Sequence, residues 1–316
     1  MATIRKSGLR LDADYTEDVV GFALESFLAT FTFPSHRFSI EPFSRSDERW
    51  LGADARLYGH IAGFRPFYMQ FKRPSAYTDF STSRIIKDRK KLTLQVSPRA
   101  LYFQLREKQK THKDFQHNIL LKLRGYLRCL NIGDAAYVCP LFLDRSSYRS
   151  NLHQASMARR QLFWPYDPWD LEDVLMTANG NQIRFDRVPV LAEHISIPPH
   201  TIVKHAKHRY SFTESGTDLC FHSPESIPDG AVNLAKFLMA ASEGFLGRGI
   251  KITPESSAIT LKELIQSVID TAQERDFFQA LGAFDEDDPF GKWFAWGDYL
   301  HTEYGIDQYA LVRWKE

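Results

Sequence analysis

The chain has 316 residues, with 40 Lys plus Arg against 39 Asp plus Glu, and 43% of its residues are hydrophobic. We expect one large domain or two modest ones, without a net basic charge that would draw nucleic acid to the whole surface. No apolar run approaches the roughly 18 residues of a membrane span, and the polar first residues do not resemble a signal peptide. The three cysteines are scattered, without zinc spacing and without an even disulfide set. Membrane and disulfide-rich secreted classes are thus excluded, and a cytoplasmic protein is predicted.

The first predicted element is an amphipathic helix over residues 14–31. Acids crowd its first turn, where they suit the helix dipole. An apolar stripe at helical spacing follows, formed by Val20, Leu24, Phe27, Leu28 and Phe31. Glu17 lies at the edge of this stripe, and Glu25 falls toward the polar face. Either acid can belong to an active site or be a solvated surface charge.

Residues 52–74 (GADARLYGHIAGFRPFYMQFKRP) are predicted to form a β-hairpin. A first arm over residues 53–61 turns at Ala62-Gly63 into a second arm over residues 66–72. Apolar and polar residues alternate along the second arm, which is typical of a strand with two different faces.

The predicted hairpin gathers three polar side chains. Gln70 and Lys72 are two residues apart, so they point the same way, and the turn brings Asp54 back beside them. An acid, an amide oxygen and an ammonium at one spot can hold a divalent cation and an attacking water. The alternative is an ordinary hairpin whose exposed face contains these residues by coincidence.

Further elements are predicted on both sides of the hairpin. Residues 38–41 (FSIE) form a strand before it, and residues 101–105 (LYFQL) form a strand after it. Residues 115–129 form a helix with Gln116 in its first turn, and residues 135–143 (AAYVCPLFL) form a buried strand.

The stretch between residues 84 and 128 is locally basic. Its only acids are Asp88, Glu107 and Asp114, against Arg84, Lys87, Arg89, Lys90, Lys91, Arg99, Arg106, Lys108, Lys110, Lys113, Lys122, Arg124 and Arg128. Because it directly follows the hairpin, it is predicted to contact a phosphate backbone, although such a run can also be a solvated surface.

The second half of the chain is predicted to be α+β. Strands are expected at residues 182–185, 202–212 and 218–222, the last two joined by a turn over residues 213–217. Helices are expected at residues 230–246 and 261–279. No obvious linker divides the chain, which favours an elaboration of the first sheet over a separate domain.

Five of the histidines in this half raise the question of a metal site: His194, His200, His205, His208 and His222. Their spacing fits no zinc pattern, so structural or surface roles are predicted. On the expected strand, His205 shares one face with Lys207, and His208 lies on the other face with Lys204. Lys204, Lys207 and Arg209 are alternatively expected to extend a DNA-facing surface.

The order of helix, hairpin, helix and strand, with Asp54 and Lys72 in the hairpin, resembles the PD-(D/E)xK superfamily of restriction-endonuclease-like nucleases. Gln70 stands where Glu or Asp is usual, and some branches of the superfamily use Gln there. The resemblance implies an α/β (α+β) fold. A restriction-endonuclease-like αβββαβ core, with a mixed central sheet flanked by helices, would occupy residues 1–150. Residues 151–316 would be an α+β elaboration or a second domain.

The resemblance also implies residue roles. Catalysis would rest on Asp54, Gln70, Lys72 and a helix acid, Glu17 or its rival Glu25. Mg²⁺ or Mn²⁺ would be bound by Asp54, the Gln70 side-chain oxygen and the backbone carbonyl of Phe71, with Glu17 acting directly or through water. Nucleic acid would be contacted by Gln116, Arg73, Lys90 and Lys91.

The implied function is a metal-dependent endonuclease that hydrolyses phosphodiester bonds of DNA, with a role in restriction or anti-phage defence by analogy. Two sites are needed for a double-strand break, so a homodimer is expected, and a defence system would add a partner protein. The alternatives are a catalytically inactive nucleic-acid-binding module, a partner-activated subunit of the same fold, and a scaffold whose hairpin is coincidental.

Overall fold

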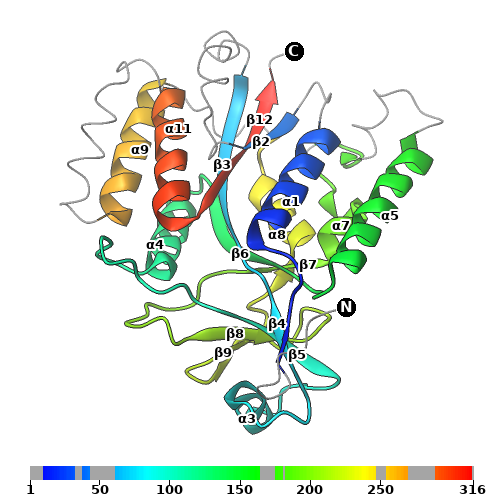
Figure 1. Ribbon diagram of the computed structural model, residues 1–316. Coiled ribbons are helices and arrows are strands. Elements are labelled where there is room, and N and C mark those ends of the chain that lie inside the picture. Colours follow the sequence, from blue (N-terminus) through cyan, green and yellow to red (C-terminus); the bar gives the residue numbers. More distant parts are fainter. Residues whose placement is uncertain are drawn as a thin grey trace.

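Two six-stranded sheets organise the chain. The computed structural model describes residues 10–32, 38–42, 61–163, 175–180, 182–246, 254–269 and 289–314. Figure 1 shows a central sheet between two groups of helices, with the second sheet below it. Within the described ranges, no helix is both long and apolar enough to cross a membrane.

The central sheet has the strand order β11-β7-β6-β3-β12-β2. Its strands are β2 (Phe38–Pro42), β3 (Ile61–Phe71), β6 (Asp134–Pro140), β7 (His194–Ile197), β11 (Val232–Asn233) and β12 (Asp307–Trp314). β3 and β6 run parallel, and the other neighbouring pairs are antiparallel. β3 is buried from Gly63 to Phe71, as expected for a strand that is covered on both faces.

Helices cover both faces of the central sheet (Figure 1). One group consists of α4 (Gln116–Cys129), α9 (Pro254–Val268) and α11 (Pro289–Tyr299). The other consists of α1 (Glu17–Thr32), α5 (Arg145–Phe163), α7 (Pro189–Ala192) and α8 (Leu234–Ser242).

Side chains of β3 alternate between these two groups. The Phe67 ring meets Phe237 of α8 at a centroid distance of 6.4 Å. The Tyr68 hydroxyl donates instead to Gln308, whose amide donates to the Trp293 carbonyl of α11. Gln70 and Lys72 follow Tyr68 at intervals of two residues and therefore face the α4–α11 group.

The second sheet is antiparallel, with the order β1-β4-β5-β8-β9-β10. Its strands are β1 (Arg10–Asp12), β4 (Ser75–Thr78), β5 (Arg99–Gln104), β8 (Arg209–Phe212), β9 (Cys220–Phe221) and β10 (Glu225–Ser226), and α3 (Arg84–Lys91) packs beside β4. Only residues 72–74 separate β3 from β4. Lys72 therefore lies at the junction of the two sheets.

Most elements predicted in the first half are confirmed. The helices expected at residues 14–31 and 115–129 are α1 and α4, and the strands expected at residues 38–41, 101–105 and 135–143 correspond to β2, β5 and β6. The mixed α+β class is confirmed as well. β5, however, belongs to the second sheet and not to the sheet that contains β3.

The hairpin turn predicted at Ala62-Gly63 is wrong. Both residues lie inside β3, which runs without interruption from Ile61 to Phe71. Gly63 pairs with Arg313 of β12, so the antiparallel partner comes from the end of the chain and no reversal is needed there. Asp54 and the rest of the expected first arm before Ile61 lie outside the described residues.

Predictions for the second half are partly confirmed. β8 and β9 flank the expected turn, in which Gly216 has a positive φ of 76°. The strand expected at residues 202–212 begins only at Arg209, and Phe185 opens the short 3-10 helix η3 (Phe185–Arg187) instead of ending a strand. The expected later helices correspond to α8 and to α9, which already begins at Pro254.

Strands from both halves of the chain share each sheet. β7, β11 and β12 join the central sheet, and β8, β9 and β10 join the second sheet. β12 lies between β2 and β3, so the end of the chain completes the sheet that its beginning starts.

Candidate active site

The end of β3 buries two polar side chains next to each other. Gln70 is 1% exposed and Lys72 is 4% exposed. The backbone N–H of Lys72 donates to the Val138 carbonyl over 2.8 Å, which continues the β3–β6 pairing past the last strand residue. The backbone at the end of β3 is therefore held in the sheet, and the period-2 spacing puts both side chains on the same side of it, as predicted.

The Lys72 ammonium has few partners for a buried charge. Its Nζ donates to Gln116 Oε1 over a long 3.4 Å and lies 5.8 Å from the centre of the Tyr137 ring. Burial lowers the pKa of Lys72, the charge of Glu17 opposes that decrease, and Arg106 lowers the pKa further. Lys72 is therefore a destabilised cation close to both an acid and an arginine.

Gln70 presents an oxygen without a partner. Its Oε1 is buried and accepts no hydrogen bond from any described residue. Leaving a buried amide oxygen unpaired costs on the order of 1–3 kcal/mol, so such an atom calls for an explanation. A hard cation is one group that this oxygen can bind.

Glu17 is the helix acid at this site. It opens α1 and is exposed, and its Oε1 accepts the backbone N–H of Arg73 over 3.2 Å. Glu25 lies two turns further along α1, about 12 Å down the helix axis. Of the two acids, Glu17 is therefore the one that contacts the chain just after β3, through the backbone of Arg73.

Gln116 is held from both ends of its amide. It is the first residue of α4 and is buried; its Oε1 accepts from Lys72, and its Nε2 donates to the Tyr304 carbonyl. Tyr304 ends the π-helix η4 (Leu300–Tyr304), and Gly305 follows with a positive φ of 61°. A Cβ at Gly305 would lie 3.3 Å from Arg106 Nη1 and 3.5 Å from Gln116 Nε2. The Gln116 amide therefore links the Lys72 ammonium to the backbone carbonyl of Tyr304.

Arg106 and the Tyr304–Gly305 turn belong to this site but were not singled out from the sequence. Arg106 appeared only as one member of the basic stretch. A Gly directly after a helix is a known end signal, and Gly305 fits it, but nothing local indicates that the turn would face Gln116.

The basic residues do not form one continuous surface. Arg73 is exposed, and its guanidinium donates to the Tyr15 carbonyl over 3.4 Å. Lys90 and Lys91 are exposed on α3, at the far end of the second sheet in Figure 1, and the Lys90 ammonium donates to the Asp79 carbonyl. Arg89, expected at the surface, is wholly buried. Of the described basic residues, Arg73 directly follows Lys72 in the chain, and Arg106 is close enough to lower the pKa of Lys72.

The metal prediction is only partly covered by the described residues. Among them, no three His, Cys, Asp or Glu side chains come close enough to hold an ion. Asp54 lies outside the described ranges. The donors that can be placed are the Gln70 oxygen and the Glu17 carboxylate, and both are the oxygen ligands that Mg²⁺ prefers. The Phe71 carbonyl belongs to the residue between Gln70 and Lys72.

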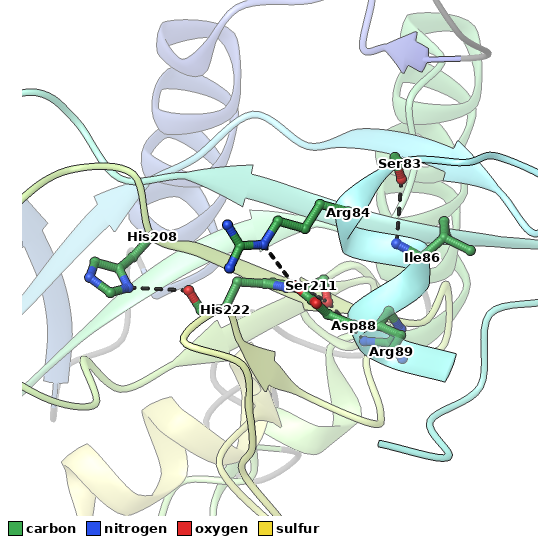
Figure 2. A network of polar contacts seen from close by, with 8 residues as sticks. All are labelled: Ser83, Arg84, Ile86, Asp88, Arg89, His208, Ser211 and His222. Carbon is green, nitrogen blue, oxygen red and sulfur yellow. Dashed lines mark hydrogen bonds and ion pairs between the residues drawn. The ribbon is translucent and has the colours of Figure 1, made fainter. Parts of the chain in front are cut away.

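A second polar network lies between α3, β8 and β9 (Figure 2). Asp88 Oδ2 is 3.2 Å from His222 Nδ1, and His222 Nε2 is 2.8 Å from Ser211 Oγ. The order resembles that of an acid, base and nucleophile. Ser211, however, is 0% exposed, and Arg89 donates to the same hydroxyl over 3.0 Å. Because this hydroxyl is already bonded to both His222 and Arg89, the network is interpreted as structural.

Fold and site together define a mixed α+β protein with a buried Gln-x-Lys pair at the end of a central strand. Comparison of the chain with family models, with curated proteins and with solved structures found no match. The function therefore has to be argued from the site itself.

Proposed function

We propose that this chain is a metal-dependent endonuclease of the restriction-endonuclease-like type, which hydrolyses phosphodiester bonds of DNA. One observation carries the proposal: a buried Lys72 ammonium lies two residues after an unpaired buried Gln70 oxygen, with Glu17 and Gln116 at the same strand end. Burying the Lys72 ammonium and the unpaired Gln70 oxygen lowers stability, and such costly groups cluster at functional sites.

The donor set suits Mg²⁺ or Mn²⁺. Asp54, Gln70 Oε1 and the Phe71 carbonyl would bind the ion, with Glu17 acting directly or through water. The unpaired Gln70 oxygen supports this assignment. When bound, the ion would polarise the phosphate and offset the negative charge that builds up during attack.

The residues of the chain supply positioning and charge. Lys72 orients the attacking water and offsets charge on the phosphate, and Gln116 holds Lys72 in place. The water oxygen forms a bond to phosphorus and releases a proton to solvent, one P–O bond of the backbone breaks, and the leaving oxygen takes up a proton from solvent. Arg73 and Arg106 flank this position and bind the neighbouring phosphates.

The wider setting follows the same proposal. A cytoplasmic enzyme of restriction or anti-phage defence would act as a homodimer when it breaks both strands, and a partner protein of the system would activate it. These roles rest on the resemblance of the Asp54, Gln70 and Lys72 pattern.

Cleavage is tested with supercoiled plasmid and with single-stranded DNA in Mg²⁺ or Mn²⁺. We expect cutting that EDTA abolishes and that Asp54→Ala and Lys72→Ala each reduce by about 100-fold or more. Lys87→Ala is the matched control, because Lys87 is an exposed lysine of α3 away from the site. Equal nicking by wild type and variants would mean contamination and would overturn the proposal.

The alternative is a nucleic-acid-binding module without catalysis, and Gln70 in place of an acid favours it. It would bind DNA in a salt-sensitive way and cut neither substrate. The same experiment therefore separates the two functions when binding is measured beside cleavage.

A further inference from the structure

Three rings form a continuous stack at one side of the second sheet. The His205 and His208 rings lie 4.4 Å apart with an interplanar angle of 3°. His208 lies on Phe221 at 4.9 Å and 7°. Phe221 is buried and His205 is exposed, so the stack runs outward from the core. His205 and His208 were expected on opposite faces of a strand, but the strand begins only at Arg209, which leaves both rings free to stack.

The middle of this stack is firmly held. The His208 ring donates from Nδ1 to the His222 carbonyl over 3.2 Å (Figure 2). Its backbone carbonyl accepts the N–H of Leu105 over 3.2 Å, and Phe221 pairs with Tyr210 inside the second sheet. The His205 ring thus rests on two rings that are held in place, and this order reduces the entropy lost when a ligand binds.

The two histidines are not arranged to share a metal. A metal ion lies in the plane of each imidazole that binds it, because the nitrogen lone pair lies in that plane. The two ring planes are nearly parallel and stacked, so they have no common position for an ion. No described residue stacks on the outer face of His205.

The stack lies beside the candidate active site. The loop that carries it docks on the start of α4: His117 Nε2 donates to the Thr201 carbonyl, and Asn118 exchanges two hydrogen bonds with Val203. Leu105, which is bonded to His208, directly precedes Arg106 next to Gln116. The two sites therefore flank the same helix end.

Two lysines flank the exposed ring in the sequence. Lys204 and Lys207 are exposed on either side of His205 in the chain, and neither makes an ion pair with a described residue. An exposed aromatic face with a lysine on either side in the sequence matches a nucleotide, whose base can stack while its phosphates meet the lysines.

We infer that the outer face of His205, with Lys204 and Lys207, binds an unpaired base of single-stranded DNA and leads that strand to the Lys72 site. This deepens the proposed nuclease function and rests on it. The substrate is then single-stranded DNA or a duplex with an extruded base, since a base inside a helix has no free face to offer.

The test uses oligonucleotides that carry 2-aminopurine, whose fluorescence falls when it stacks, mixed with the whole protein in EDTA. Wild type should quench the probe, and His205→Phe should keep the quenching because it keeps a ring. His205→Ala should lose it and bind about 5- to 100-fold more weakly. Since His205 is exposed, these changes leave the core untouched.

Charge is tested separately with Lys207→Ala. This change should reduce the salt dependence of binding by about 0.7 in the log–log slope and leave the quenching in place. His205→Ala should leave that slope unchanged. Wild-type affinity and quenching in His205→Ala would overturn the inference, as would a protein that binds only fully paired duplex.

Failure of this inference differs from failure of the proposed function. Because EDTA prevents cleavage, quenching is read without catalysis. Cleavage of plasmid without quenching would overturn only the inference that His205 binds a base. Quenching by a protein that cuts nothing would support base binding at His205 and overturn the proposed nuclease function.

Discussion

Lys72 Nζ lies 3.4 Å from Gln116 Oε1, so residues from the end of β3 and the start of α4 meet at the junction of the two sheets. The contact is a long hydrogen bond to a neutral amide and does little to offset the burial of the ammonium. Lys72 is held in place at a cost in stability.

The first prediction is that Lys72→Met stabilises the protein and abolishes cleavage. Because burial lowers the pKa of Lys72, the unfolded chain binds the proton more readily than the folded one. Between the two pKa values the stability of the wild type rises with pH, and below the folded value the full cost is present. We expect Met to raise the free energy of unfolding at pH 7 by roughly 1–3 kcal/mol.

Urea unfolding in EDTA at pH 7 and again near pH 9.5 measures this difference. The advantage of Met should shrink as the pH rises toward 10.5, the ordinary pKa of lysine, because the folded wild type loses its proton before the unfolded chain does. Lys87→Met, on the exposed face of α3, should change stability little at either pH. A less stable Met variant at pH 7 would mean that Glu17 and Gln116 stabilise the ammonium fully.

The second prediction concerns the unpaired oxygen of Gln70. Gln70→Leu removes it and should weaken Mn²⁺ binding by about 10-fold or more. Gln70→Glu adds a charge that binds a cation more tightly, but without metal it places a carboxylate at a position that is 1% exposed.

Thermal unfolding with and without Mn²⁺ checks both changes. Gln70→Glu should melt below wild type in EDTA and gain more than wild type from Mn²⁺, because bound metal stabilises the folded state. Equal gains from Mn²⁺ in all three proteins would show that Gln70 does not touch the ion.

The third prediction tests whether β12, near the end of the chain, belongs to the central sheet. The buried Tyr68 hydroxyl donates to Gln308 Oε1 over 2.6 Å, which links β3 to β12. Tyr68→Phe leaves that oxygen unpaired and should cost about 1–3 kcal/mol.

A double-mutant cycle with Gln308→Met isolates the pair. Because the double variant has no unpaired oxygen at this position, its loss of stability should be smaller than the sum of the two single losses. Simple additivity would argue against the contact and against the position of β12.

Sequence patterns were sufficient where structure is local. Helical spacing of Val20, Leu24 and Leu28 indicated α1, and alternation in the second arm placed Gln70 and Lys72 on one side of a strand. Gln116 was linked to the site through the family resemblance and does contact Lys72.

Long-range pairing was not visible in the sequence. β12 replaces the expected turn at Gly63 because Arg313, at the other end of the chain, pairs there, and no local signal carries that information. The same holds for the Tyr304 carbonyl, whose contact with Gln116 spans 188 positions and depends on a π-helix. Such contacts follow from how elements pack, which local periodicity does not encode.

The fourth prediction concerns Gly305 at the edge of the candidate site. Its φ of 61° disfavours any side chain, and a Cβ would press on Arg106. Gly305→Ala should cost about 1–2 kcal/mol and should also lower cleavage, because Arg106 has to move away from the added Cβ.

Gly244→Ala is the matched control, since Gly244 has a similar φ of 72° with nothing within 4 Å of an added Cβ. Both variants should lose similar stability in thermal unfolding, and only Gly305→Ala should lose activity. Equal activity of the two variants would show that the Gly305 turn plays no part in the activity of the candidate site.

The fifth prediction is a loss of stability in acid that His194 causes. His194 is wholly buried, its Nδ1 donates to the Val190 carbonyl, and burial lowers its pKa to about 4. Above pH 6.5 the ring is neutral in both states, and its titration has no effect on stability. Between pH 6.5 and 4 only the unfolded chain binds the proton, so the free energy of unfolding falls as the pH falls.

The slope from one such histidine is at most about 1.4 kcal/mol per pH unit, or about 3 kcal/mol over the whole window. His194→Phe removes this titration and should flatten the dependence of stability on pH. Burial also lowers the pKa of His117 to about 4, so in this variant His117 still contributes to the pH dependence of the free energy of unfolding. Urea unfolding at half-unit steps from pH 7 to 4 gives the slopes, with His153→Gln on the exposed face of α5 as the control. A His194→Phe protein that loses stability in acid as steeply as wild type would show that the buried ring accepts its proton in the folded state.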